Sequence, residues 1–133
     1  MPGDPVKQFL RARGCPDDVV AEGLEGLVSN WERIAAEVRD GYPLGLDDYL
    51  NDLDARQLLE GALTVADADE DDPVRARVDA ADRLMRSAVR PVTECLWGDA
   101  VAAMEGWTPE NNWWYFSLPR VPGTMLRDDL AGD

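Results

Sequence analysis

The sequence predicts an all-α fold, a mainly helical domain of five or six helices followed by an irregular, aromatic-rich C-terminal strap. Apolar residues recur at helical spacing along most of residues 5–90. An aspartate followed by a proline stands at residues 4–5 and again at 72–73, a pairing typical of an N-cap and the first helical position. The strap contains many prolines, asparagines and glycines, which favour turns and leave room for only a short strand. A chain of 133 residues fits one domain, predicted over residues 1–133.

The first two predicted helices lie before residue 41. A short helix begins after Asp4 and closes at Gly14, and its apolar side carries Val6, Phe9 and Leu10. The longest helix follows over residues 17–40, because apolar residues recur there at spacings of three and four. This stripe consists of Val20, Leu24, Leu27, Trp31, Ile34 and Val38. Gly23 and Gly26 lower its helix propensity and allow a neighbouring helix to approach closely.

Two further helical regions are predicted in the middle of the chain. A short apolar stripe follows a turn at residues 42–45, and Asp54 is placed to cap its continuation through Ala66. Residues 67–72 are acidic without apolar periodicity, so we expect a solvated loop. The helix that starts at Pro73 carries apolar residues on one side and arginines around the remainder. These are Arg75, Arg77, Arg83, Arg86 and Arg90, which pair with the acidic helices or stay solvated.

The last third of the chain predicts shorter elements. Helical segments are expected over 92–97 and 99–106, with a break at Gly98. Residues 113–118 are predicted as a short strand or an extended strap, and Thr124 as the cap of a last short helix. Successive side chains of an extended segment point to opposite faces, so the four consecutive rings of residues 113–116 cannot all enter one core. Some of them must seal the end of the helical bundle or meet a partner.

Composition excludes several classes of function. The formal net charge is −14, and such a surface repels phosphate backbones and acidic lipids, so we expect no nucleic-acid and no membrane partner. The absence of histidine excludes Ser-His-Asp and Cys-His nucleophiles and zinc sites that need imidazole. Cys15 and Cys95 have no CxxC spacing, so reduced thiols and a cytoplasmic location are expected. We expect no cofactor.

The acidic loop begins with a pattern that resembles an EF-hand. Asp67, Asp69 and Asp71 have the opening spacing of such a calcium loop. Position 6 of the loop is Asp72 instead of glycine, and position 12 is Val78 instead of glutamate. The sequence therefore favours a solvated charge run over a calcium site.

Paired carboxylates three residues apart support an alternative hypothesis. Glu22 with Glu25, and Glu37 with Asp40, resemble the pairs by which some all-helical nucleotide pyrophosphohydrolases hold magnesium. Both pairs lie on one predicted helix, about 22 Å apart at 1.5 Å per residue, so they cannot share a metal ion. Asp79 with Asp82 offers a substitute second pair on another helix. On this hypothesis the chain is a divalent-metal-dependent hydrolase of phosphorylated small molecules. Solvated helix faces are the competing interpretation of the same residues.

The favoured hypothesis is a protein that acts by binding a basic protein partner, without catalysis. Tryptophan and tyrosine are enriched at interfaces, and an anionic surface steers a basic partner toward it. The candidate binding residues are Trp107, Trp113, Trp114, Tyr115, Arg120, Asp47, Asp48 and Asp52. Small anionic inhibitors of toxins share this character, so an inhibitor, immunity-like or adaptor role is predicted. A homo-oligomer that buries the tryptophans is left open.

Overall fold

A computed structural model describes residues 4–67 and 72–131 and confirms the mainly helical fold class. The described residues form six α-helices, one 3₁₀ helix and two short strands. The helices are α1 (Pro5–Ala12), α2 (Asp17–Asp40), α3 (Leu46–Val65), α4 (Pro73–Ala88), α5 (Asp99–Glu105) and α6 (Thr124–Ala131). The 3₁₀ helix η1 spans Trp113–Phe116, and the strands are β1 (Val89–Pro91) and β2 (Ser117–Pro119). Residues 68–71, which hold most of the EF-hand-like pattern, lie outside the described residues.

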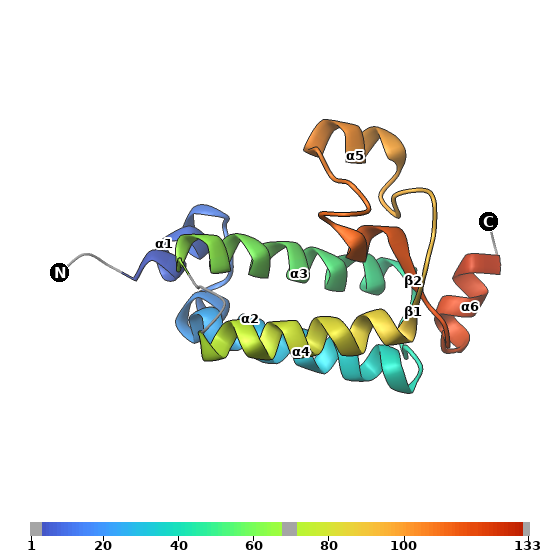
Figure 1. Cartoon of the computed structure of the whole chain (residues 1–133), viewed down its shortest axis with the longest axis horizontal. Coiled ribbons are helices and arrows are strands. Elements are labelled where there is room, and N and C mark those ends of the chain that lie inside the picture. The colour runs from blue at the N-terminus through green and yellow to red at the C-terminus, as the bar shows by residue number, and fades with distance from the viewer. Residues whose placement is uncertain (1–3, 68–71, 132–133) are drawn as a thin grey trace.

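Helices α2, α3 and α4 form the body of the molecule, with α1 across one end and α6 at the other (Figure 1). Helix α2 packs against both α3 and α4, and the core lies between these three helices. Trp31, Leu59 and Met85 are among the side chains that fill it. Helix α5 stands away from this body on the chain between β1 and η1 (Figure 1).

The predicted caps at Asp4 and Asp72 are confirmed. The Asp4 carboxylate accepts a hydrogen bond from Val6 N at 2.8 Å, and the Asp72 carboxylate accepts one from Val74 N at 2.9 Å. Each satisfies a backbone N–H that the first turn of a helix leaves without an internal partner.

The long helix is confirmed over the predicted range but is kinked at Gly23. This residue has φ 61° and ψ −147°, a conformation that only glycine adopts readily. From Leu27 onward the predicted stripe is buried, and Trp31 and Ile34 are almost completely inaccessible. Gly23 therefore changes the direction of the chain, a role that its low helix propensity alone did not predict.

Helix α3 runs unbroken through Asp54, so the predicted cap at that position is wrong. The helix begins at Leu46, after Gly45, which has no side chain to cap it. Asp129 of α6 supplies the cap from a distance, because its carboxylate accepts a hydrogen bond from Leu46 N at 2.8 Å. This bond joins α6 to the start of α3.

The helix predicted over 92–97 is absent, because backbone groups in this segment bond to the 3₁₀ helix instead. Val92 N donates to Phe116 O and Leu96 N donates to Tyr115 O, each at 2.8 Å. Strands β1 and β2 pair antiparallel just before this point, with Arg90 opposite Leu118. The short strand predicted in the strap is thus confirmed, and its pairing fixes the strap to the end of α4.

A buried arginine joins α3, α4 and α2. Arg56 is 3% exposed, and its guanidinium donates to both carboxylate oxygens of Asp82, at 3.0 and 2.9 Å. The same carboxylate accepts a hydrogen bond from Trp31 Nε1 at 2.8 Å. The guanidinium also bonds to Glu60 at 3.2 Å and lies 4.4 Å from the ring centre of Trp114. This Arg56 network is the principal polar contact within the core.

Within the part of the chain that the structure describes, no helix combines the length and the apolar character needed to cross a membrane.

Candidate functional site

The 3₁₀ helix η1 distributes its side chains in three directions. A 3₁₀ helix has three residues per turn, so residues three apart share a side. Asn112 and Tyr115 line one cavity, Trp113 and Phe116 line another, and Trp114 enters the core beside Arg56. Tyr115 and Trp114 are each 1% exposed. The prediction that these side chains alternate between two faces is therefore wrong. Residues 113–116 form a 3₁₀ helix, in which side-chain directions repeat every three residues and not every two.

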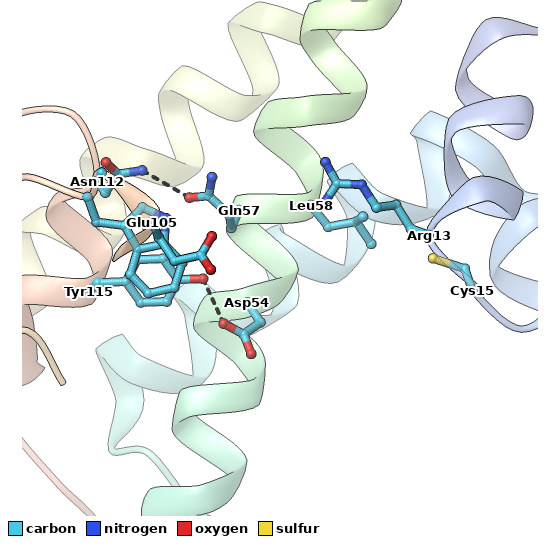
Figure 2. A pocket seen from close by; sticks show the side chains of 10 residues that line it. Arg13, Cys15, Asp54, Gln57, Leu58, Glu105, Asn112 and Tyr115 are labelled. Atoms are coloured by element: carbon cyan, nitrogen blue, oxygen red, sulfur yellow. Dashed lines mark hydrogen bonds between the residues drawn. The ribbon is translucent and has the colours of Figure 1, made fainter. Parts of the chain in front are cut away.

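The larger cavity is a cleft of about 610 Å³ over the middle of α3. Figure 2 shows α3 as its floor, with the α5–η1 segment on one side and the end of α1 on the other. Its lining residues are Arg13, Cys15, Asp54, Gln57, Leu58, Glu105, Gly106, Trp107, Asn112 and Tyr115. Two of the candidate aromatic residues, Trp107 and Tyr115, thus meet in this cleft.

The aromatic wall of the cleft is fixed in place by hydrogen bonds to α3. Tyr115 OH donates to Asp54 Oδ1 at 2.6 Å, and Asn112 Nδ2 donates to Gln57 Oε1 at 3.0 Å (Figure 2). Trp107 stacks on Tyr115 with ring centres 4.0 Å apart and planes 15° apart. Burial, together with the bond to Asp54, raises the pKa of Tyr115 well above its usual value, so the phenol remains a donor.

The electrostatic character of the cleft is uneven. Asp54 and Glu105 place carboxylates beside the stacked rings, whereas Arg13 lies across the cleft (Figure 2). Asp54 accepts a second hydrogen bond, from Trp97 Nε1 at 3.1 Å, yet remains exposed. An aromatic face flanked by carboxylates suits a guanidinium or an ammonium group.

Other candidate residues of the strap lie on the opposite side of η1. Trp113 and Arg120 line a second cavity, of about 330 Å³, together with Arg86. Trp114 lines neither cavity, and its buried Nε1 has no hydrogen-bond partner in the described structure. The candidate aromatic residues therefore divide between two cavities and the core and form no single patch.

The three candidate aspartates of α3 differ from one another. Asp47 and Asp48 are exposed in the first turn. Asp52 is half-buried, its carboxylate accepts a hydrogen bond from Tyr42 OH at 2.6 Å, and burial raises the pKa of its carboxyl group. Asp47 precedes Asp54 by seven residues, which places both on one face of α3 about 10 Å apart. The first turn of α3 therefore extends the acidic side of the cleft.

The carboxylate pairs of the alternative hypothesis have arginine partners. Glu25 bonds to Arg77 at 2.6 Å, and Asp82 belongs to the Arg56 network. Glu22 and Asp79 are exposed. Among residues 4–67 and 72–131, no three His, Cys, Asp or Glu side chains are grouped so that they could hold a metal ion.

Several residues of the cleft were not predicted as site residues, namely Asp54, Gln57, Glu105 and Asn112. Their common property is spatial, because α3, α5 and η1 bring them together. Asp47 and Asp54 lie seven residues apart and therefore share one face of a helix. This spacing is the one local signal in the sequence that connects the cleft with the predicted acidic surface. No family model, no curated protein and no solved structure matches this chain.

Proposed function

We propose that this chain acts by binding a basic protein partner in the cytoplasm, in an inhibitor, immunity-like or adaptor role, without catalysis. The observation that carries the proposal is the cleft over α3, where Asp54 and Glu105 flank the Trp107–Tyr115 stack. An arginine or lysine of the partner can lay its charged group against the partly exposed ring of Trp107, which covers the buried Tyr115. It can then form charge-assisted hydrogen bonds with the carboxylates.

The cleft suits such an anchor because it is already ordered. The Tyr115–Asp54 and Asn112–Gln57 hydrogen bonds hold the aromatic wall before a partner arrives. Binding then orders few side chains, which lowers its entropic cost. A cation over an aromatic face contributes about 0.5–2 kcal/mol, depending on how far it is desolvated.

The wider acidic surface supports the choice of a basic partner. Asp47 extends the negative side of the cleft along α3, and Asp48 adds a second exposed carboxylate to the same turn. Charges of this kind speed association and make it sensitive to salt, since the Debye length is about 8 Å at physiological ionic strength. The partner is therefore expected to dissociate as salt increases.

Affinity capture from a lysate of the native host, at low and moderate salt, tests the proposal. The bait variants W107A and E105Q alter the cleft, and D47K/D48K reverses the charge of the first turn of α3. D17K/D18K is the matched control, because these aspartates also lie exposed in the first turn of a helix. Asp52 stays unchanged, since its hydrogen bond to Tyr42 makes it part of the fold.

The expected result is one basic protein that the wild type and D17K/D18K retain and that the other three variants lose. Circular dichroism melting first establishes that each variant is folded. Equal retention by all variants would contradict a site at this cleft. An empty eluate, together with a rise in melting temperature on adding magnesium or manganese, would favour the metal-dependent hydrolase built on Glu22, Glu25, Asp79 and Asp82. Light scattering identifies a homo-oligomer.

A further inference from the structure

The second cavity combines two arginines with an apolar lining. It lies between the end of α4, strand β1 and the η1 segment, and its volume is about 330 Å³. Its apolar lining consists of Val89, Pro91, Val92, Pro109, Trp113 and Phe116. Arg86, Arg120 and Ser117 supply its polar groups.

This cavity is positively charged in a chain that is otherwise strongly acidic. Its lining contains no carboxylate, whereas four other cavities of the described structure each contain at least one. Within the described residues, neither Arg86 nor Arg120 forms an ion pair. The Arg86 guanidinium lies 4.5 Å from the ring centre of Trp113, which holds it at the cavity wall. Both arginines therefore keep N–H donors available for an anion.

We propose that this cavity binds a monocarboxylate attached to an apolar group. A planar carboxylate matches the fork of N–H donors on a guanidinium, and the apolar lining receives the remainder of the ligand. The volume lies at the lower end of the range of about 300–1,000 Å³ for ligand sites, which suits a group the size of an aromatic ring.

The net negative charge of the whole chain favours singly charged anions over anions with a higher charge. The net charge of −14 repels each approaching anion, and the repulsion grows with the charge of the ligand. A group with a single negative charge overcomes this field more easily than a phosphate ester or a polyphosphate. This inference is independent of the proposed function, because it concerns a ligand of opposite charge on the other side of η1.

Two sources share this ligand chemistry, a small aromatic or aliphatic acid and the C-terminal residue of a peptide. The test titrates the full chain at low salt with 3-phenylpropionate and with its neutral amide. A second arm uses acetyl-Leu-Phe with a free or an amidated C-terminus. The signal is the NMR shift of the Trp113 indole N–H, which reports on the cavity itself.

The variants R86Q and R120Q test the two guanidinium groups, and R83Q is the matched control. Arg83 is exposed on α4 one turn before Arg86, so R83Q changes the net charge equally but lies outside the cavity. All three replaced side chains are exposed, and we expect wild-type melting from each variant.

We expect saturable binding of the acids, at least tenfold weaker binding of the amides, and about a tenfold loss in R86Q and in R120Q but not in R83Q. Tighter binding of the peptide acid would assign the site to a protein C-terminus, and tighter binding of phenylpropionate to a small molecule. Each of four results would overturn the proposal. The first two are equal binding of acid and amide and an equal loss of affinity in R83Q. The others are the absence of a saturable shift at Trp113 and binding of inorganic phosphate that is tighter than binding of the acids.

Discussion

Replacement of Arg56 by methionine is expected to destabilise the fold by about 3 kcal/mol. Removing one partner of a buried ion pair costs about 3–5 kcal/mol, because the remaining charge stays buried without compensation. The lower end applies here, since the Asp82 side chain is 17% exposed and regains some water. The loss is large against a total stability of about 5–15 kcal/mol for a typical domain.

The double variant R56M/D82L distinguishes the network from simple loss of packing. Without the arginine, the Asp82 carboxylate is the group that destabilises the core, so removing it restores part of the stability. The recovery is incomplete because Trp31 Nε1 then loses its acceptor, at a cost of about 1–3 kcal/mol. The double variant is therefore expected to be more stable than R56M by up to about 2 kcal/mol.

Urea unfolding followed by far-ultraviolet circular dichroism measures the stability of both variants. Tryptophan fluorescence is not used as the signal, because the fluorescence of the tryptophans near Arg56 changes with the substitution itself. R75M is the control. Arg75 lies 3.9 Å from Glu60 and is 28% exposed, so we expect its loss to change stability by less than about 0.5 kcal/mol. A loss below about 1 kcal/mol in R56M, or additive losses in the double variant, would refute the reasoning.

Two further predictions concern Asp52 and Gly123. Burial raises the pKa of Asp52 despite the hydrogen bond from Tyr42, so the folded chain binds this proton more tightly than the unfolded chain. The free energy of unfolding of the wild type relative to D52N should therefore rise as pH falls from about 7 toward about 4. Denaturant titrations across this interval check the sign, and a constant or falling difference contradicts it. In G123A the new Cβ would overlap the Tyr42 carbonyl, so thermal melting should show a loss of about 1–3 kcal/mol, and unchanged melting would contradict this packing.

The elements that the sequence predicts well depend on local signals. A cap needs only an aspartate and the two or three residues that follow it, which is why Asp4 and Asp72 are predicted at the right positions. The stripe of α2 likewise follows from spacing within one helix. These signals do not depend on where other helices lie, so a single sequence contains them in full.

The features that the sequence does not reveal depend on distant contacts. Asp54 has the chemistry of a cap, but its carboxylate accepts hydrogen bonds from Trp97, which precedes α5, and from Tyr115, which follows it. The burial of Arg56 has a local signal in the sequence, because Arg56 falls at helical spacing within the buried stripe formed by Leu53, Leu59 and Leu63. This spacing indicates that the arginine faces the core. It does not indicate the ion pair with Asp82, since Asp82 belongs to another helix.

The separation of the two cavities follows from the period of η1. In a strand, Tyr115 and Phe116 would point to opposite faces, and Trp114 would share a face with Phe116. With three residues per turn, Trp114 instead packs into the core while its neighbours line different cavities. The backbone bonds from Leu96 to Tyr115 and from Val92 to Phe116 hold this turn in place. One short segment therefore contributes to two cavities of opposite charge. Tyr115 supports Trp107 in the cleft that contains Asp54 and Glu105, whereas Trp113 lines the cavity that contains Arg86 and Arg120. A cation in the cleft and an anion in the second cavity would not compete for one site.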